Sequence, residues 1–121
     1  SAMLARLIPE IRSLGIRVCL FLEPHEKALR LAKDLGASMV EIHTGGYAEG
    51  RVSAGEILQA ADAGDSMGLG INAGHGLTVE NARRLGQGKI QEFSIGHSII
   101  CRSVMVGLEE AVREMKAAIQ G

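Results

Sequence analysis

"GLGINAGHGLTVENARRL" occupies residues 68–85 and joins an apolar strand pattern, a glycine-rich turn and a helix start. Its first part, "GLGIN" (68–72), predicts a strand whose side chains alternate between two faces. Thr78 can cap the helix that follows, with Asn81 in the place usually taken by Glu. His75 stands in the turn, between two glycines. A strand that passes through a short loop into a helix is the repeating unit of α/β folds.

The same order recurs along the chain. Apolar patterns predict further strands at 16–22, 38–43 and 90–95. Helical spacing of apolar residues predicts helices at 2–14, 24–35, 53–67, 78–85 and 98–119, and residues 45–50 form a glycine-rich loop. Ser53 with Glu56 indicates a capping box at the start of the third helix. One helix followed by four strand–helix units predicts a parallel sheet with right-handed crossovers.

The predicted strands are apolar on one face and small or polar on the other. The apolar positions include Val40, Ile42, Phe93 and Ile95, and the positions that alternate with them include Glu41, His43, Glu92 and Ser94. A doubly wound sheet is covered by helices on both faces and is apolar on both. The alternation therefore predicts barrel curvature, with a polar interior and outer helices, rather than a flavodoxin-like sheet.

Size and composition limit the classes of protein that fit. The chain has 121 residues, which predicts a single domain over 1–121, about half of a typical eight-stranded barrel. Its 13 basic and 14 acidic residues form no basic stripe, which excludes nucleic acid as a partner. No apolar run is long enough to span a bilayer and no signal-peptide pattern is present, so no membrane partner is expected.

The sequence also indicates the state of the two cysteines and the origin of the first two residues. Cys19 and Cys101 lack CxxC spacing and lie in apolar sequence, so they are expected to be reduced, packed thiols, which fits a cytoplasmic protein. Ser1-Ala2 before Met3 is interpreted as a cloning scar.

Reactive side chains gather at three predicted strand ends: Glu41 with His43, Asn72 with His75, and Gly96 with His97. Ligands of parallel α/β folds bind at the carboxyl ends of the strands. A histidine between glycines can exchange a proton near neutral pH, although an exposed turn histidine gives the same pattern. The Gly96-His97-Ser98 segment opens a predicted helix, where backbone N–H groups and Arg102 or His97 favour a phosphate.

Several side chains allow more than one interpretation. Glu41 is predicted to face the barrel interior, where it is either functional or paired with Arg17. Tyr47 either covers a ligand or anchors its loop, and His25 is expected to be solvated. His43, His75 and His97 with Glu41 form an alternative metal site, although their spacing is not that of a helical zinc motif.

Four stretches resemble one family. They are "GIRVCLFLEP" (15–24), "VEIHTGGYA" (40–48), "GLGINAGHGLTVEN" (68–81) and "FSIGHSIICRSVMVGLEEAVREMK" (93–116), and together they resemble pyridoxine 5′-phosphate synthase of the deoxyxylulose-dependent vitamin B6 route. The resemblance implies the C-terminal half of a (β/α)₈ TIM barrel. The family is a transferase that condenses 3-amino-2-oxopropyl phosphate with 1-deoxy-D-xylulose 5-phosphate, and releases phosphate and water without a metal or organic cofactor.

The resemblance also implies site residues. His75 is similar to the family's proton-donating His and Glu41 to its transition-state-stabilising Glu. Gly76 corresponds to a substrate-contacting Gly, and Gly96 with His97 to the phosphate-binding pair. The family's N-terminal half, with a second catalytic His and a further catalytic Glu, has no counterpart in this sequence.

A half-barrel exposes two strand edges and an inner face, which favour association. The sequence therefore predicts a homodimer or a higher homo-oligomer that binds phosphorylated small molecules or inorganic phosphate. Two functions fit this prediction. The chain is either a pyridoxine 5′-phosphate synthase-like protein or a catalytically inactive half-barrel that binds phosphate and associates with itself.

Overall fold

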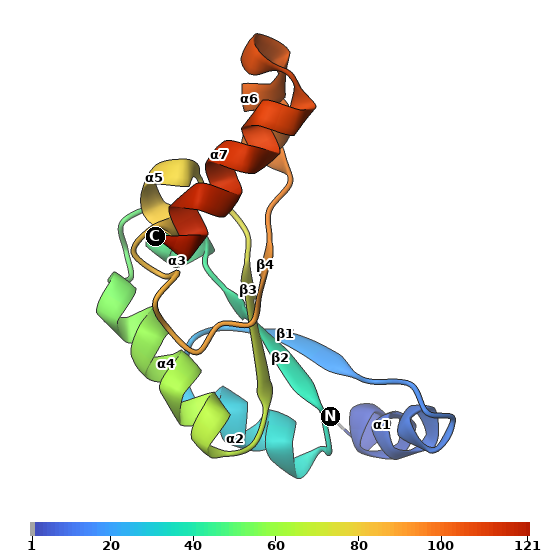
Figure 1. The fold of residues 1–121 in the computed structure, drawn as a ribbon. Helices are drawn as coiled ribbons and strands as arrows, with labels where there is room; N and C mark the ends of the chain where they lie inside the picture. The colour runs from blue at the N-terminus through green and yellow to red at the C-terminus, as the bar shows by residue number, and fades with distance from the viewer. Residues whose placement is uncertain (1) are drawn as a thin grey trace.

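The computed structural model describes residues 2–121 (Figure 1). Ser1 of the expected cloning scar lies outside the described residues. The strands are β1 (Cys19–Leu22), β2 (Met39–His43), β3 (Gly70–Gly74) and β4 (Glu92–Ser94). The helices are α1 (Ala2–Ser13), α2 (Glu26–Asp34), α3 (Gly45–Ala48), α4 (Ala54–Ser66), α5 (Val79–Ala82), α6 (His97–Val106) and α7 (Leu108–Gln120).

The four strands form one parallel sheet in the order β1-β2-β3-β4, with helices between them. The predicted α/β fold with four parallel strands is therefore confirmed. One row of the register runs across the whole sheet and pairs Phe21 with Glu41, Glu41 with Asn72 and Asn72 with Glu92. Residues in one row of a parallel sheet point to the same face. The polar positions that the sequence placed inside a barrel therefore share one face.

The hydrophobic core lies on the opposite face. Val40, Ile42 and Ile71 are fully buried there, against Leu29 of α2 and Ile57 of α4. Figure 1 shows α2 and α4 on the same side of the strands. On the inner face Phe21 is 58% exposed, and Glu92 and Ser94 are also exposed. Helices therefore cover the outer face, as a half-barrel requires.

Both predicted capping boxes are present. Ser53 Oγ accepts from the Glu56 amide, and Glu56 Oε2 accepts from the Ser53 amide at 2.8 Å. Thr78 and Asn81 make the same reciprocal pair at the start of α5, with the Thr78 amide donating to Asn81 Oδ1 at 2.7 Å. Each box satisfies amides that a helix start leaves unpaired.

Several predicted boundaries are wrong. β3 runs from 70 to 74 rather than 68 to 72, because Gly68 (φ +76°) ends the α4 turn and Gly74 still pairs with His43. Asn72 therefore lies in the middle of a strand, beside Glu41, and not at its end. The single helix expected over 98–119 is two helices, since Gly107 (φ +86°) breaks it. The loop 45–50 contains a helical turn, α3.

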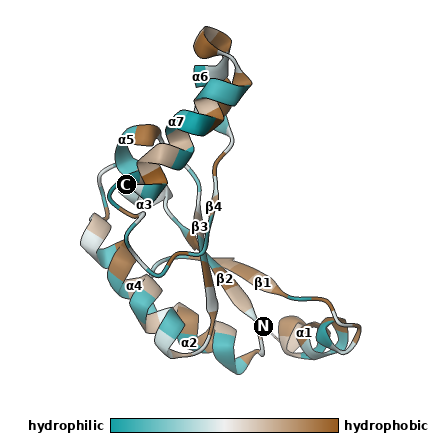
Figure 2. Cartoon of the chain, in the orientation of Figure 1, coloured by the Kyte–Doolittle hydropathy of each residue, from teal (hydrophilic) through white to brown (hydrophobic). Residues whose placement is uncertain are grey.

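Two burial predictions are also wrong. Cys19 and Cys101 are exposed free thiols rather than packed ones. Cys19 lies on the open inner face, and Cys101 lies on α6, which projects with α7 away from the sheet (Figure 1). Figure 2 shows hydrophobic residues on this projecting pair, where Val104 is 80% and Leu108 57% exposed.

Within residues 2–121, no helix has both the length and the apolar character needed to cross a bilayer.

Candidate functional site

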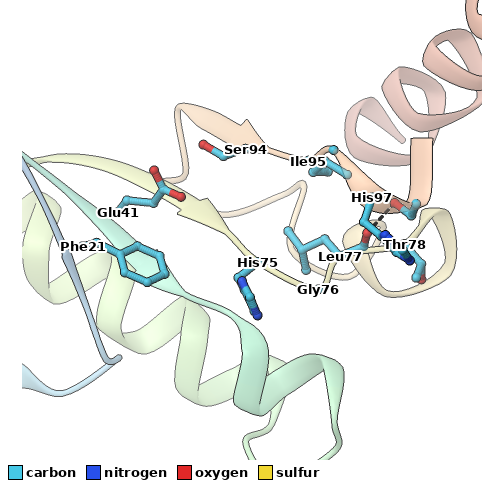
Figure 3. A pocket seen from close by; sticks show the side chains of 11 residues that line it. Phe21, Glu41, His75, Gly76, Leu77, Thr78, Ser94, Ile95 and His97 are labelled. Atoms are coloured by element: carbon cyan, nitrogen blue, oxygen red, sulfur yellow. Dashed lines mark hydrogen bonds between the residues drawn. The ribbon is translucent and has the colours of Figure 1, made fainter. Parts of the chain in front are cut away.

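A pocket of about 520 Å³ lies at the carboxyl ends of the strands. It is lined by Phe21, Glu41, His75, Gly76, Leu77, Thr78, Ser94, Ile95, Gly96, His97 and Ser98. Figure 3 shows Glu41 and His97 toward opposite ends of this pocket, with His75, Gly76 and Leu77 between them. The five residues that the resemblance assigned to the site, Glu41, His75, Gly76, Gly96 and His97, therefore line the same pocket, whereas His43, Asn72 and Arg102 do not.

The His75 backbone is held in an unusual conformation. Its φ is +88°, and among residues 2–121 it is the one non-glycine residue with positive φ. The buried Thr44 fixes this turn, because its Oγ1 lies 2.8 Å from the Gly74 carbonyl oxygen and 2.7 Å from that of His75. Left-handed backbone at a non-glycine residue is uncommon and strained, and such strain clusters at functional sites. The backbone of His75 therefore makes it a candidate functional residue.

The middle of the inner face carries the carboxylate of Glu41 and a buried amide oxygen, Asn72 Oδ1, that lacks a hydrogen-bond donor among residues 2–121. Glu41 is half-buried and forms no ion pair with Arg17 in the described structure. Its neighbour Asn72 is 6% exposed, and Asn72 Oδ1 lacks a hydrogen-bond partner within residues 2–121. Desolvation raises the pKa of the nearby Cys19 thiol, and the carboxylates of Glu41 and Glu92 raise it further. This region therefore favours a hydrogen-bond donor or a cation.

The other end of the pocket is a helix start. Gly96 is the N-cap of α6 and His97 its first residue, so the first backbone N–H groups of the helix have no partner within it. Ser98 Oγ donates to the Leu77 carbonyl oxygen at 2.6 Å and ties this helix start to the loop that carries His75. His97 Nε2 lies 3.6 Å from Cys101 Sγ on the next turn. The amides and the imidazole together suit an anionic group.

The structure does not bring together the three imidazoles of the alternative metal site, His43, His75 and His97. His43 and His75 are neighbours, with ring centroids 4.8 Å apart, whereas His97 contacts Cys101. The described residues contain no group of three or more His, Cys, Asp or Glu side chains that could hold a metal ion.

Tyr47 and His25 lie outside the pocket. The Tyr47 hydroxyl donates to the Asn81 carbonyl oxygen at 2.8 Å, which favours the interpretation of Tyr47 as a loop anchor. His25 is exposed at the N-cap of α2, as expected.

Sequence analysis missed Glu23. It follows the end of β1, and its Oε1 accepts from His43 Nδ1 at 2.7 Å. Its position directly after the strand predicted at 16–22 was the available signal, because the other candidate residues lie at strand ends as well. His43 was expected among the reactive side chains at strand ends and in the alternative metal site, but its contact with His75 depends on tertiary structure.

The fold and the pocket define a four-stranded parallel (β/α) half-barrel with a polar site at the carboxyl ends of its strands. Comparison with known sequences gives the family. The model of the family described as "Pyridoxal phosphate biosynthesis protein PdxJ" matches residues 1–121, and the chain belongs to this family.

Curated relatives carry the name pyridoxine 5′-phosphate synthase. The protein from Coxiella burnetii (strain Dugway 5J108-111) is 44% identical over 98% of this chain and 52% of its own length. Those from Pelodictyon phaeoclathratiforme and Thermodesulfovibrio yellowstonii are each 46% identical, over 98% and 97% of this chain and 53% and 51% of their own lengths. The chain therefore spans about half the length of these relatives.

Replacing His75 tests whether its backbone is strained. His75→Gly and His75→Ala both remove the imidazole, but only glycine adopts φ +88° without strain. We expect the free energy of unfolding in urea to be about 1 kcal/mol higher for the glycine variant than for the alanine variant.

The matched pair Gln59→Gly and Gln59→Ala is the control, in the exposed middle of α4. There the order reverses, with glycine about 1 kcal/mol less stable than alanine. A His75→Gly variant no more stable than His75→Ala would show that the turn is not strained.

Proposed function

We propose that this chain forms the C-terminal half of a pyridoxine 5′-phosphate synthase and supplies the proton-donating and phosphate-binding part of its site. The observation that carries the proposal is that one pocket is lined by His75, Glu41 and the Gly96-His97 pair. These are the positions that resemble the family's functional residues. The proposed reaction joins 3-amino-2-oxopropyl phosphate to 1-deoxy-D-xylulose 5-phosphate and needs no metal or organic cofactor.

Each residue has a role that its surroundings support. His75 is exposed at the pocket and donates a proton to a leaving oxygen, and Gly76 leaves room for substrate beside it. Glu41 places a carboxylate where positive charge on the reacting carbon or nitrogen is stabilised. The N–H groups at the start of α6 and the His97 imidazole bind a substrate phosphate.

The rest of the reaction requires a partner for the open inner face. The relatives are about twice as long as this chain, and Asn72 Oδ1 has no hydrogen-bond donor in the described structure. Catalytic groups that act as a unit lose most of the rate when one of them is missing. We therefore assign the complete reaction to an assembly of this chain with the N-terminal half of the barrel.

On its own, we propose, the chain forms a homodimer. β1 and β4 are the edges of the sheet, and strand edges pair readily with further strands. Phe21 is 58% exposed on the inner face beside one of these edges, and apolar side chains of α6 and α7 are exposed as well. Both thiols are free, which suits the reducing cytoplasm as the compartment.

Inorganic phosphate tests the anion site directly. Titration of the chain should shift the backbone amide NMR signals of residues 96–98 and saturate. His97→Ala should weaken binding by about tenfold, because a hydrogen bond to a charged group contributes about 1.5–3 kcal/mol. His25→Ala is the matched control, since it also removes an exposed histidine at a helix start. Unmoved signals at 96–98, or equal shifts at all exposed amides, would exclude this site.

Activity is tested by coexpressing the chain with the N-terminal half of the Coxiella burnetii synthase and measuring pyridoxine 5′-phosphate. We expect negligible turnover by the chain alone and measurable turnover by the pair. His75→Ala should lower kcat of the pair by about 100-fold or more, the usual contribution of a general acid, and His25→Ala should not. A pair that copurifies without activity would favour the inactive phosphate-binding half-barrel.

Light scattering tests the homodimer. At high micromolar concentration we expect a mass twice the 12.8 kDa of the chain. Phe21→Glu places a charge on the inner face and should give monomers, whereas Leu31→Glu changes an equally apolar residue, 54% exposed on α2, and should not. A wild-type mass of 12.8 kDa would rule the homodimer out.

A further inference from the structure

We propose that Glu23 and His43 are positioning residues that set the orientation of the His75 imidazole. The proposal rests on the proposed function for the role of His75 as proton donor. Neither Glu23 nor His43 lines the pocket that holds the other site residues. Their influence on it therefore passes through His75.

The three residues stand at successive strand ends. Glu23 follows β1, His43 ends β2, and His75 follows β3, where Gly74 is the register partner of His43. Parallel pairing brings these ends to one edge of the sheet. The contact is therefore a product of the fold and not of proximity in sequence.

The Glu23 contact determines which ring nitrogen of neutral His43 carries the proton. An ionised carboxylate only accepts hydrogen bonds, so the 2.7 Å contact requires the proton on His43 Nδ1. In the neutral ring Nε2 then carries the lone pair. The Glu23–His43 pair thus holds one ring orientation and one tautomer, as outer carboxylates do for functional histidines elsewhere.

His43 in turn packs against His75. Their ring centroids are 4.8 Å apart and the planes are inclined by 58°. Gly74 and Gly76, the neighbours of His75 in sequence, offer no side chains. This ring-to-ring contact, together with the close approach of Gly45, borders the His75 imidazole directly. The position of the His43 ring therefore limits the orientations open to the His75 side chain.

Gly45 lies directly against both imidazole rings. A Cβ at this residue would lie 2.7 Å from His43 Nε2 and 3.0 Å from His75 Cδ2. Real Cβ atoms essentially never come within 3.0 Å of another heavy atom, so a side chain at residue 45 would displace the His43 ring and crowd that of His75. The glycine in the "HTGG" segment thus leaves room for both rings.

NMR of the histidine rings in the chain alone tests the proposal without any activity. Wild-type His43 should show the ¹⁵N pattern of an Nδ1–H tautomer, with ring-to-ring NOEs to His75. Glu23→Ala should convert His43 to a mixture of tautomers, shift the ring signals of His75 and increase the mobility of the His75 ring. Glu26→Ala is the matched control, because it removes a carboxylate that pairs with the exposed Arg30 instead.

Kinetics of the assembled halves give the second readout. Glu23→Ala should lower kcat about tenfold, the lower end of the loss on removing an outer partner of a functional histidine, with KM for the phosphorylated substrates unchanged. If the wild-type pair is inactive, the proposed function fails while the NMR result still decides this inference.

The inference is overturned if Glu23→Ala leaves the His75 ring signals and mobility unchanged, whether or not His43 responds. That result would show that the Glu23–His43 pair connects the ends of β1 and β2 but does not orient the His75 imidazole. Glu23→Leu, which keeps a side chain of similar size but cannot accept a hydrogen bond, replaces Glu23→Ala should the alanine variant fail to fold by circular dichroism.

Discussion

Packing of Val40, Ile42 and Ile71 against Leu29 and Ile57 is the interaction on which the structure depends. These side chains are fully buried, and each contributes about 1.5–3 kcal/mol when removed from water. Because side chains alternate along a strand, burying this set places the residues between them on the opposite face. The polar inner face is therefore a geometric consequence of the apolar outer one.

Parallel pairing then brings the candidate site residues together. All four strands run in the same direction, so the residues that follow them meet at one edge of the sheet. Thr44 adds the local constraint, since its buried hydroxyl holds the carbonyl oxygens of the His75 turn. Ser98 does the same for the start of α6 through the Leu77 carbonyl oxygen. The pocket is thus held together by side-chain hydroxyls that contact backbone carbonyl oxygens, and the His75 and His97 side chains remain exposed in it.

The sequence predicted what periodicity and local motifs control. The alternation around Glu41 identified the inner face, and the capping boxes at Ser53 and Thr78 located two helix starts. It could not predict that Gly107 breaks the last helix, since an isolated glycine is tolerated in many helices. Nor could it predict that Val104 is exposed, because an apolar stripe does not show whether a partner covers it. The Glu23–His43 contact depends on strand register, which no local pattern reports.

The Phe21–Glu41–Asn72–Glu92 row of the inner face contains acceptors in excess of donors. Glu41 and Glu92 flank Asn72 in one row, and ionised carboxylates only accept hydrogen bonds. The buried Asn72 Oδ1 adds a further acceptor, and leaving such an atom unpaired costs about 1–3 kcal/mol. A second copy of the chain brings the same two carboxylates, against which it offers on this face the Asn72 amide and the Ser94 hydroxyl as donors. A half-barrel that presents Lys or Arg side chains to this row would neutralise its carboxylates, and would therefore complement this face better than a second copy of the chain does.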